Sequence, residues 1–170
     1  MQVENGYNFS LILAAADKAI LSSLTYVQPQ LKVKWIRTID LNNRLIFLTQ
    51  IGATLSKNKN SLPLSQRFFA GGQGSLLGFN FQSIGPGYNI AIANVTYQRR
   101  IKGPFYSGLF LDVGNAYDGK FSNFRNNLQR SAGLEGVWRS PVGDITIYWA
   151  KVLSLPGHPN RFGFTLGPEL

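Results

Sequence analysis

The chain has 170 residues and no cysteine, with 44% hydrophobic and 13% aromatic residues, and no stretch approaches the roughly 20 consecutive apolar residues of a transmembrane helix. A helical membrane protein is therefore excluded. The net charge of +9 raises nucleic acid or anionic lipid as partners, but no basic run exceeds Arg99-Arg100 and no nucleic-acid motif accompanies it, so we expect no nucleic-acid partner.

Alternation of apolar and polar residues is the main pattern along the chain, and it predicts strands with one apolar face. Leu31, Val33 and Trp35 alternate with polar neighbours, as do Ile145 and Ile147 much later. Each predicted strand has about the 9 to 11 residues that a tilted strand needs to cross a bilayer. In chain order, the eight expected strands span residues 6–15, 28–38, 43–54, 88–101, 105–114, 129–139, 143–152 and 161–169.

The connections between these strands alternate between long and short. Long connections span about residues 16–27, 55–87, 115–128 and 153–160, and short ones lie near 40–42, 102–104 and 140–142. Every long loop therefore falls at one end of the sheet, which is typical of outer-membrane barrels with short periplasmic turns and long external loops. The alternative, a soluble β-sandwich, more often mixes loop lengths at both ends. The pattern predicts an all-β, antiparallel transmembrane β-barrel.

The apolar stretch near the N-terminus is not expected to be a secretory signal. An apolar stretch runs from Phe9 to Ala15, but no Lys or Arg precedes it, and a signal peptide begins with a basic segment. We therefore expect the export signal to lie upstream of Met1, and the chain to be a fragment or an engineered piece of a longer protein.

The longest predicted loop carries a recognisable motif, and three further segments follow it in order: Gly108 to Asn115, Ser140 to Gly143 and Gly167 to Leu170. Together these residues resemble the outer-membrane assembly-factor superfamily, also called bacterial surface antigens, which includes BamA, TamA and two-partner secretion transporters. The Gly-Pro-Glu-Leu ending is similar to that of TamA-like members. The loop motif comprises Arg67, Phe68, Phe69, Gly71, Gly72, Leu76, Leu77, Gly78 and Phe79.

The resemblance implies a sixteen-stranded outer-membrane barrel that follows periplasmic POTRA domains. It also implies a role in inserting or translocating outer-membrane proteins without a chemical step, hence no catalytic residue, cofactor or metal. Here residues 1–170 form one C-terminal barrel domain of eight strands without a POTRA domain, which is half of such a barrel. The strand from Tyr7 to Ala15 would close it on the same chain or on a second copy, and we expect the second copy, as a homodimer. The implied partners are outer-membrane lipid, lipopolysaccharide and client outer-membrane proteins.

The loop motif departs from the family at its tip, where Leu77 stands in place of an arginine. In the family this arginine meets acidic groups on the inner wall, an aspartate that matches Asp112 and a glutamate that aligns with Thr96. Losing one charge alone would leave a partly buried partner, so the joint loss is coherent. Two alternatives remain for Asp112: a solvated lumen charge, or pairing with an arginine. The positions assigned to this inner-wall lock are Thr96, Asp112, Glu135, Arg100 and Arg139. From the inward-facing series of their strands, Arg100 and Arg139 are the candidate partners of Asp112, and Glu135 is a candidate to share such a partner.

The last strand is expected to form one side of a lateral seam. In the family, function is attributed to a weak seam between the first and last strands, at which an incoming strand pairs by β-augmentation. Gly163 and Gly167 add little side-chain packing and favour a labile edge. The residues assigned to this seam are Phe162, Gly163, Phe164 and Gly167.

Other candidate sites carry weaker signals. Gly71-Gly72 is not followed by the Lys-Ser/Thr of a phosphate-binding loop, and His158 has no second histidine or cysteine to complete a zinc site. Asp112 and Glu135 are acids on one inner face but need no catalytic explanation. The alternatives to an assembly factor are a passive pore or structural barrel that has lost the loop lock, and a two-partner secretion transporter.

Overall fold

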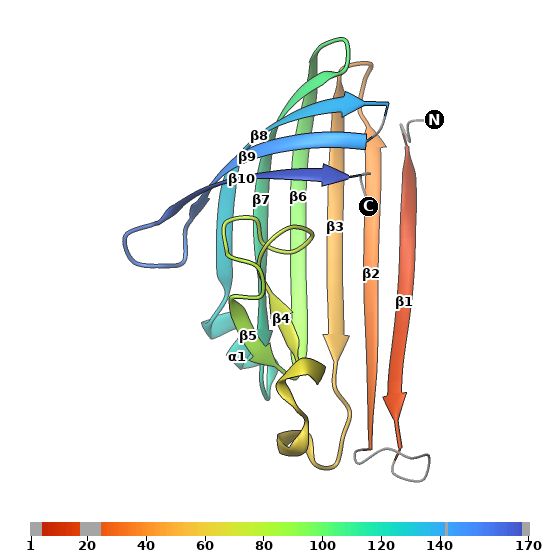
Figure 1. Cartoon of the computed structure of the whole chain (residues 1–170), viewed down its shortest axis with the longest axis vertical. Coiled ribbons are helices and arrows are strands. Elements are labelled where there is room, and N and C mark those ends of the chain that lie inside the picture. Colours follow the sequence, from red (N-terminus) through yellow and green to blue (C-terminus); the bar gives the residue numbers. More distant parts are fainter. Residues whose placement is uncertain (1–4, 18–24, 142, 168–170) are drawn as a thin grey trace.

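The computed structural model describes residues 5–17, 25–141 and 143–167, which form one antiparallel sheet of eight long strands (Figure 1). Neighbours in the sheet are also neighbours in the chain, apart from a small two-stranded hairpin, β4 with β5, inserted between β3 and β6. The eight strands are β1 (Gly6–Ala16), β2 (Tyr26–Thr38), β3 (Asn43–Ala53), β6 (Asn89–Lys102), β7 (Phe105–Tyr117), β8 (Gln129–Ser140), β9 (Gly143–Val152) and β10 (Asn160–Gly167).

All eight strands predicted by the alternating pattern are confirmed, with differences at their ends. β2 begins at Tyr26 and β7 continues to Tyr117, beyond the predicted limits, because their polar and small residues still pair with neighbouring strands. Alternation is clear in β7, where Leu109 and Leu111 are 56% and 46% exposed while Phe110 and Asp112 are 4% and 1% exposed. Residues 168 and 169 of the last predicted strand lie outside the described residues.

The sheet is strongly curved, and β8, β9 and β10 arch over β6 and β7 (Figure 1). Its two edges are β1 and β10, which do not pair with each other within the described residues. The segment between β3 and β6 lies on the concave side. The convex side carries exposed apolar side chains, including Phe9, Leu11 and Phe164. The fold is therefore an open, curved antiparallel sheet whose concave face carries both polar and apolar side chains and is partly filled.

Short and long connections occupy opposite ends of the sheet. The short turns are residues 39–42, 103–104 and 141–142, and the connections at the other end span 7 to 35 residues. At the β2–β3 turn, the Asp40 carboxylate accepts backbone N–H groups from Asn42 and Asn43 at 2.8 and 2.9 Å. A hydrogen bond from the Asn43 side chain is the largest of the effects that lower the Asp40 pKa. This turn is fixed by an ionised side chain.

Two of the long connections contain structure that the sequence did not predict. The one between β3 and β6 contains two short 3₁₀ turns, Lys59–Ser61 and Leu64–Gln66, and the hairpin of β4 (Phe68–Ala70) with β5 (Ile84–Gly87). The one between β7 and β8 contains the six-residue helix α1 (Phe121–Asn126). Among the described residues, no helix combines the length and apolar character needed to cross a bilayer.

Aromatic pairs lie on the convex face, near the end of the sheet with the short turns. Trp35 stacks on Phe47 with 5.2 Å between ring centroids, and Phe105 stacks on Trp138 at 6.2 Å. Trp35 and Trp138 are both partly exposed. This arrangement is typical of aromatic girdles at a membrane interface.

Candidate functional site

Residues 54–88, called the lid loop here, lie across the concave face of the sheet and build its main core. Leu76, near the tip of the loop, is completely buried. It belongs to a cluster whose other members come from the lid loop, β6 and the end of β9: Ala70, Phe79, Ile84, Ile90, Ile92 and Val152. Burying these apolar side chains fixes the lid loop against the wall.

Asp112 on β7 is the centre of the contact between the loop tip and the wall. Its carboxylate accepts the backbone N–H of Leu77 at 2.8 Å, the Asn94 side-chain amide at 2.9 Å and the Ser131 hydroxyl at 3.0 Å. Such bonds to a buried carboxylate are stronger than those between neutral groups. Asp112 is therefore satisfied by three donors from the loop, β6 and β8.

Two of these partners also hold the loop directly. The Ser131 hydroxyl accepts the Gly78 backbone N–H at 3.3 Å, and the Asn94 amide donates to the Ser75 carbonyl. Gly78 permits this approach because a Cβ there would lie 2.5 Å from the Ser131 Cβ. Asn94, Asp112 and Ser131 thus bind the backbone of residues 75–78 rather than a charged loop side chain.

The Leu77 side chain packs on an apolar part of the wall. Its neighbours are Phe110, Tyr148 and Ala150, and the Phe110 and Tyr148 rings meet edge to face with centroids 6.4 Å apart. Thr96, the position aligned with the family's glutamate, is paired in register with Phe110. Leu77, where the resemblance leads us to expect an arginine, therefore makes an apolar contact.

The expected pairing of Asp112 with Arg100 or Arg139 is wrong, and so is the alternative of a solvated lumen charge. The Arg100 side chain donates to the Gly103 carbonyl at the short turn. Arg139 lies 3.9 Å from Asp144 and its guanidinium is 4.1 Å from the Tyr106 ring centroid. Because amide, hydroxyl and backbone donors surround Asp112, an arginine is not needed there.

Glu135 belongs to a different polar group, nearer the short turns. It accepts from the Gln98 side chain, whose carbonyl accepts from the Arg44 guanidinium at 2.6 Å. Arg44 also lies 5.5 Å from the Tyr106 ring centroid, on which Arg139 packs as well. The expectation that Glu135 shares an arginine with Asp112 is therefore wrong. Arg44 was missed, although the pairing of Arg44 with Gln98 follows from the register of β3 and β6.

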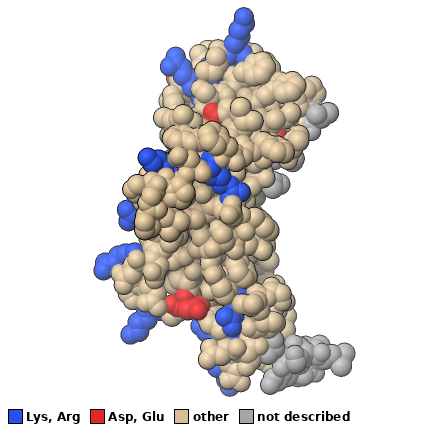
Figure 2. All heavy atoms as spheres, turned by 60° about the vertical axis from the view of Figure 1, so that its left-hand side comes forward, with Lys and Arg blue, Asp and Glu red and all other residues tan. Residues whose placement is uncertain are grey.

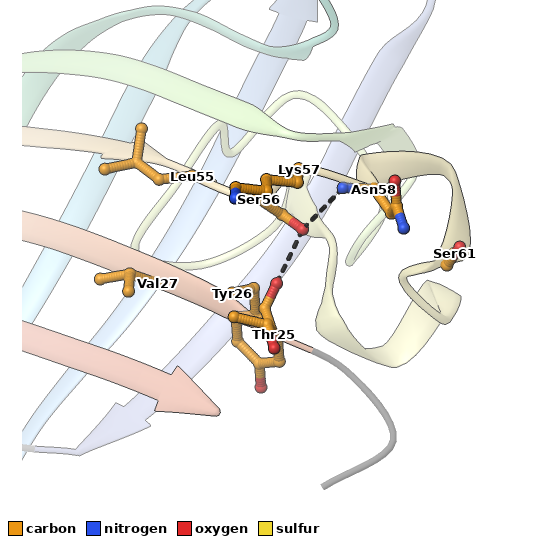
Figure 3. Close-up of a pocket in the computed structure, with 8 residues that line it drawn as sticks. All are labelled: Thr25, Tyr26, Val27, Leu55, Ser56, Lys57, Asn58 and Ser61. Carbon is orange, nitrogen blue, oxygen red and sulfur yellow. Dashed lines mark hydrogen bonds between the residues drawn. The ribbon is translucent and has the colours of Figure 1, made fainter. Parts of the chain in front are cut away.

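Two of the pockets that adjoin the lid loop lie at its tip and at its start. One of about 180 Å³ lies beneath its tip and is lined by Thr96, Gln98, Asp112 and Glu135, among others. The other, of about 570 Å³, lies where residues 55–61 leave the sheet beside the start of β2 (Figure 3). There the Ser56 hydroxyl donates to the Thr25 carbonyl and accepts the Asn58 N–H, at 2.8 and 3.3 Å. Among the described residues that line this second pocket, Lys57 is the one with a charged side chain.

At the edge strand β10, Gly163 accommodates an aromatic ring of the neighbouring strand. A Cβ on Gly163 would lie 2.4 Å from the Tyr148 ring and hydroxyl. Phe162 and Phe164 are exposed on the other face, and a Cβ on Gly167 would meet no atom within 4 Å. Gly163 itself contributes no side chain, but Tyr148 fills its place, so β10 is well packed on the β9 side.

We predict that Leu77→Arg does not stabilise the protein but lowers the free energy of unfolding, by about 0.5–3 kcal/mol. Asp112 already has three donors, Thr96 carries no charge, and the new guanidinium would replace an apolar side chain against Phe110. Urea unfolding of the membrane-inserted variant measures the effect. A stabilisation of several kcal/mol would contradict this description of the wall.

The family model described as the Omp85 superfamily domain matches residues 2–169. The outer membrane protein assembly factor BamA of Nitratidesulfovibrio vulgaris is 29% identical over 159 residues, which cover 84% of this chain and 20% of that protein. The crystal structure of Haemophilus ducreyi BamA lacking POTRA domains 1–3 aligns with a TM-score of 0.78 at 18% identity, covering 95% of this chain and 37% of that one. The structural likeness concerns the fold, and the chain spans about a fifth of the length of its curated relative.

Proposed function

We propose, because this chain belongs to the Omp85 superfamily, that it forms part of a gated outer-membrane barrel that helps client proteins to insert into or cross the membrane. The family resides in the bacterial outer membrane and consists of non-enzymatic assembly factors. The chain is accordingly an outer-membrane protein and not an enzyme. Client outer-membrane proteins are its proposed partners.

The observation that carries this proposal is the lid loop held on the concave wall by its own backbone. Asp112 and Ser131 accept the N–H groups of Leu77 and Gly78, and these bonds resist sliding of the tip. A loop docked in this way fills the lumen without a covalent or ionic lock. We infer that the lid loop occludes the barrel, and that the barrel wall stays curved while its edge opens.

The edge that opens is proposed to be β10. Its outward backbone groups are not paired with another strand within the described residues, so they offer a template for an incoming strand. The finer assignment to TamA-like members is supported by the Gly-Pro-Glu-Leu ending. Pro168, Glu169 and Leu170 of that ending lie outside the described residues.

Closure of the barrel is proposed to need a second copy. A bilayer offers no water to the open edges, so each unpaired backbone group there costs several kcal/mol. A barrel of eight strands closed on themselves has an interior just wide enough for side chains. The lid loop occupies the concave side, so such a barrel would leave no room for it. β1 runs away from the short turns and β10 runs toward them, so two copies can meet through two antiparallel seams.

Cysteines at Ser10 and Thr165 test this closure, because both side chains belong to the concave series of their strands. We predict that oxidation of Ser10→Cys/Thr165→Cys in lipid gives a covalent dimer on a denaturing gel. The matched control is Leu11→Cys/Thr165→Cys, in which one thiol lies on the opposite face of its strand and should not cross-link. A bridge within one chain would show that the barrel closes on itself and would refute the two-copy arrangement.

The function itself is tested by following the folding of a client barrel in liposomes that contain this protein. We expect faster client folding than in empty liposomes. Leu77 on its apolar patch favours a second candidate, a passive pore. Ion conductance without accelerated client folding would support the pore and contradict an assembly role.

A further inference from the structure

A hollow of about 590 Å³ interrupts the convex face of β8, β9 and β10. Its walls are apolar, and most of the side chains that form them are exposed. They come from three adjacent strands whose register places them in two neighbouring rows. The convex side chains that line the hollow are Leu134, Ile147, Trp149, Phe162 and Phe164.

Gly136 makes this hollow. It occupies a convex position between Leu134 and Trp138 on β8 and pairs with Ile147, so its missing side chain leaves a gap in an otherwise continuous apolar surface. A Cβ at Gly136 would meet Ile147 at 3.4 Å, an ordinary van der Waals contact. The space at Gly136 thus accepts a Cβ without a clash.

Two cations lie on the same convex face, on the side of the long connections. Lys151 is two residues beyond Trp149 on β9, about 7 Å along the strand, and pairs with Ala132 and Asn160. Arg130 lies two residues before Ala132 on β8. Both side chains are exposed, and neither has a hydrogen bond or an ion pair among residues that the structure describes.

The charge of these residues fixes their depth in the membrane. A lysine or arginine on the lipid-facing side costs about 2–4 kcal/mol at the bilayer midplane and nearly nothing at the interface. Arg130 begins β8 and Lys151 nearly ends β9, so both belong at the external interface. Basic residues also outnumber acidic ones over the face that Figure 2 brings forward.

We propose that this surface is a docking site for a phosphorylated glycolipid of the outer leaflet. One acyl chain lies in the hollow over Gly136, and a headgroup phosphate contacts Lys151 and Arg130. An apolar hollow beside interfacial cations matches an anionic lipid, which carries an acyl chain and a charged headgroup in one molecule. The site lies beside β10, so a bound lipid would stabilise the convex side of the proposed seam.

This proposal requires the membrane orientation given above but not the assembly activity, so its test measures lipid alone. The membrane protein is purified in detergent, and its dissociation constants for bis-phosphorylated lipid A and for dephosphorylated lipid A are measured by native mass spectrometry. The variants are Arg130→Gln/Lys151→Gln, which removes the cations, and Gly136→Leu, which fills the hollow. The control is Lys120→Gln/Arg125→Gln, which removes two exposed cations from the α1 region.

We expect the loss of both interfacial cations to weaken phosphorylated lipid A binding about thirtyfold and to leave dephosphorylated lipid A nearly unchanged. Gly136→Leu should weaken both lipids by about tenfold, and the control should stay within about twofold. Equal losses in the control pair would show unspecific charge attraction and overturn the site. A cysteine in place of Ile147 can be tested for thiol labelling. If a synthetic client strand protects this cysteine from labelling and lipid A does not, the hollow binds protein instead of lipid.

Discussion

Replacing Asp112 by alanine is expected to detach the tip of the lid loop and to lower the free energy of unfolding by about 3–5 kcal/mol. The substitution removes the acceptor for Leu77, Asn94 and Ser131, and each buried donor left without a partner costs about 1–3 kcal/mol. Limited trypsin digestion of the membrane-inserted protein reports the release, because Lys57, Lys59 and Arg67 lie in the loop.

Thr96→Ala is the matched control for this experiment. Thr96 lies on the neighbouring strand, lines the same pocket as Asp112, and its hydroxyl makes no hydrogen bond among the described residues. Its replacement should change the free energy of unfolding by no more than about 0.5 kcal/mol and leave the loop protected. If Asp112→Ala is digested no faster than Thr96→Ala, the backbone anchor does not hold the loop.

Gly163→Ala is expected to destabilise the packing of β10 by about 1–3 kcal/mol, since the added Cβ would lie 2.4 Å from the Tyr148 ring. Hydrogen exchange of the β10 amides measures the local effect. The Tyr148→Ala change removes the obstacle, so Gly163→Ala should cost much less in that background, with a coupling free energy of about 0.5–3 kcal/mol.

Gly136→Ala serves as the control for a glycine-to-alanine change in the same sheet. Its Cβ would lie 3.4 Å from Ile147, so the free energy of unfolding should change by about 0.5 kcal/mol at most. If the effects of Gly163→Ala and Tyr148→Ala on stability are additive, the packing of the Tyr148 ring does not depend on Gly163.

The strands were predictable because each one has a single apolar face, and a period of two survives even where polar residues fill the concave side. The register of β6 with β7 would also have placed Asn94 opposite Asp112, but the sequence alone does not show that the amide turns to the carboxylate. The short helix α1 left no signal, because six residues are too few for a helical repeat.

The loop tip was predictable only in part. The motif indicated that Leu77 lies in a loop. It also indicated that the arginine expected at this position, and one of the two acidic residues that it meets in the family, are absent. That Leu77 meets Phe110 and Tyr148 depends on strands far apart in the sequence. Arg139 was paired with the wrong acid, because charge alone does not show that Asp144, across the β8–β9 turn, is nearer.

The insertion of a client barrel into liposomes, with the seam either free or bridged, tests the assembly role most directly. In the Ser10→Cys/Thr165→Cys protein we expect client folding to be faster than in empty liposomes when the thiols are reduced, and to fall to the empty-liposome rate when they are oxidised. Reduction should restore the faster rate. Equal client folding in the bridged and free states, with the bridge verified on a gel, would contradict insertion through an opening at β10.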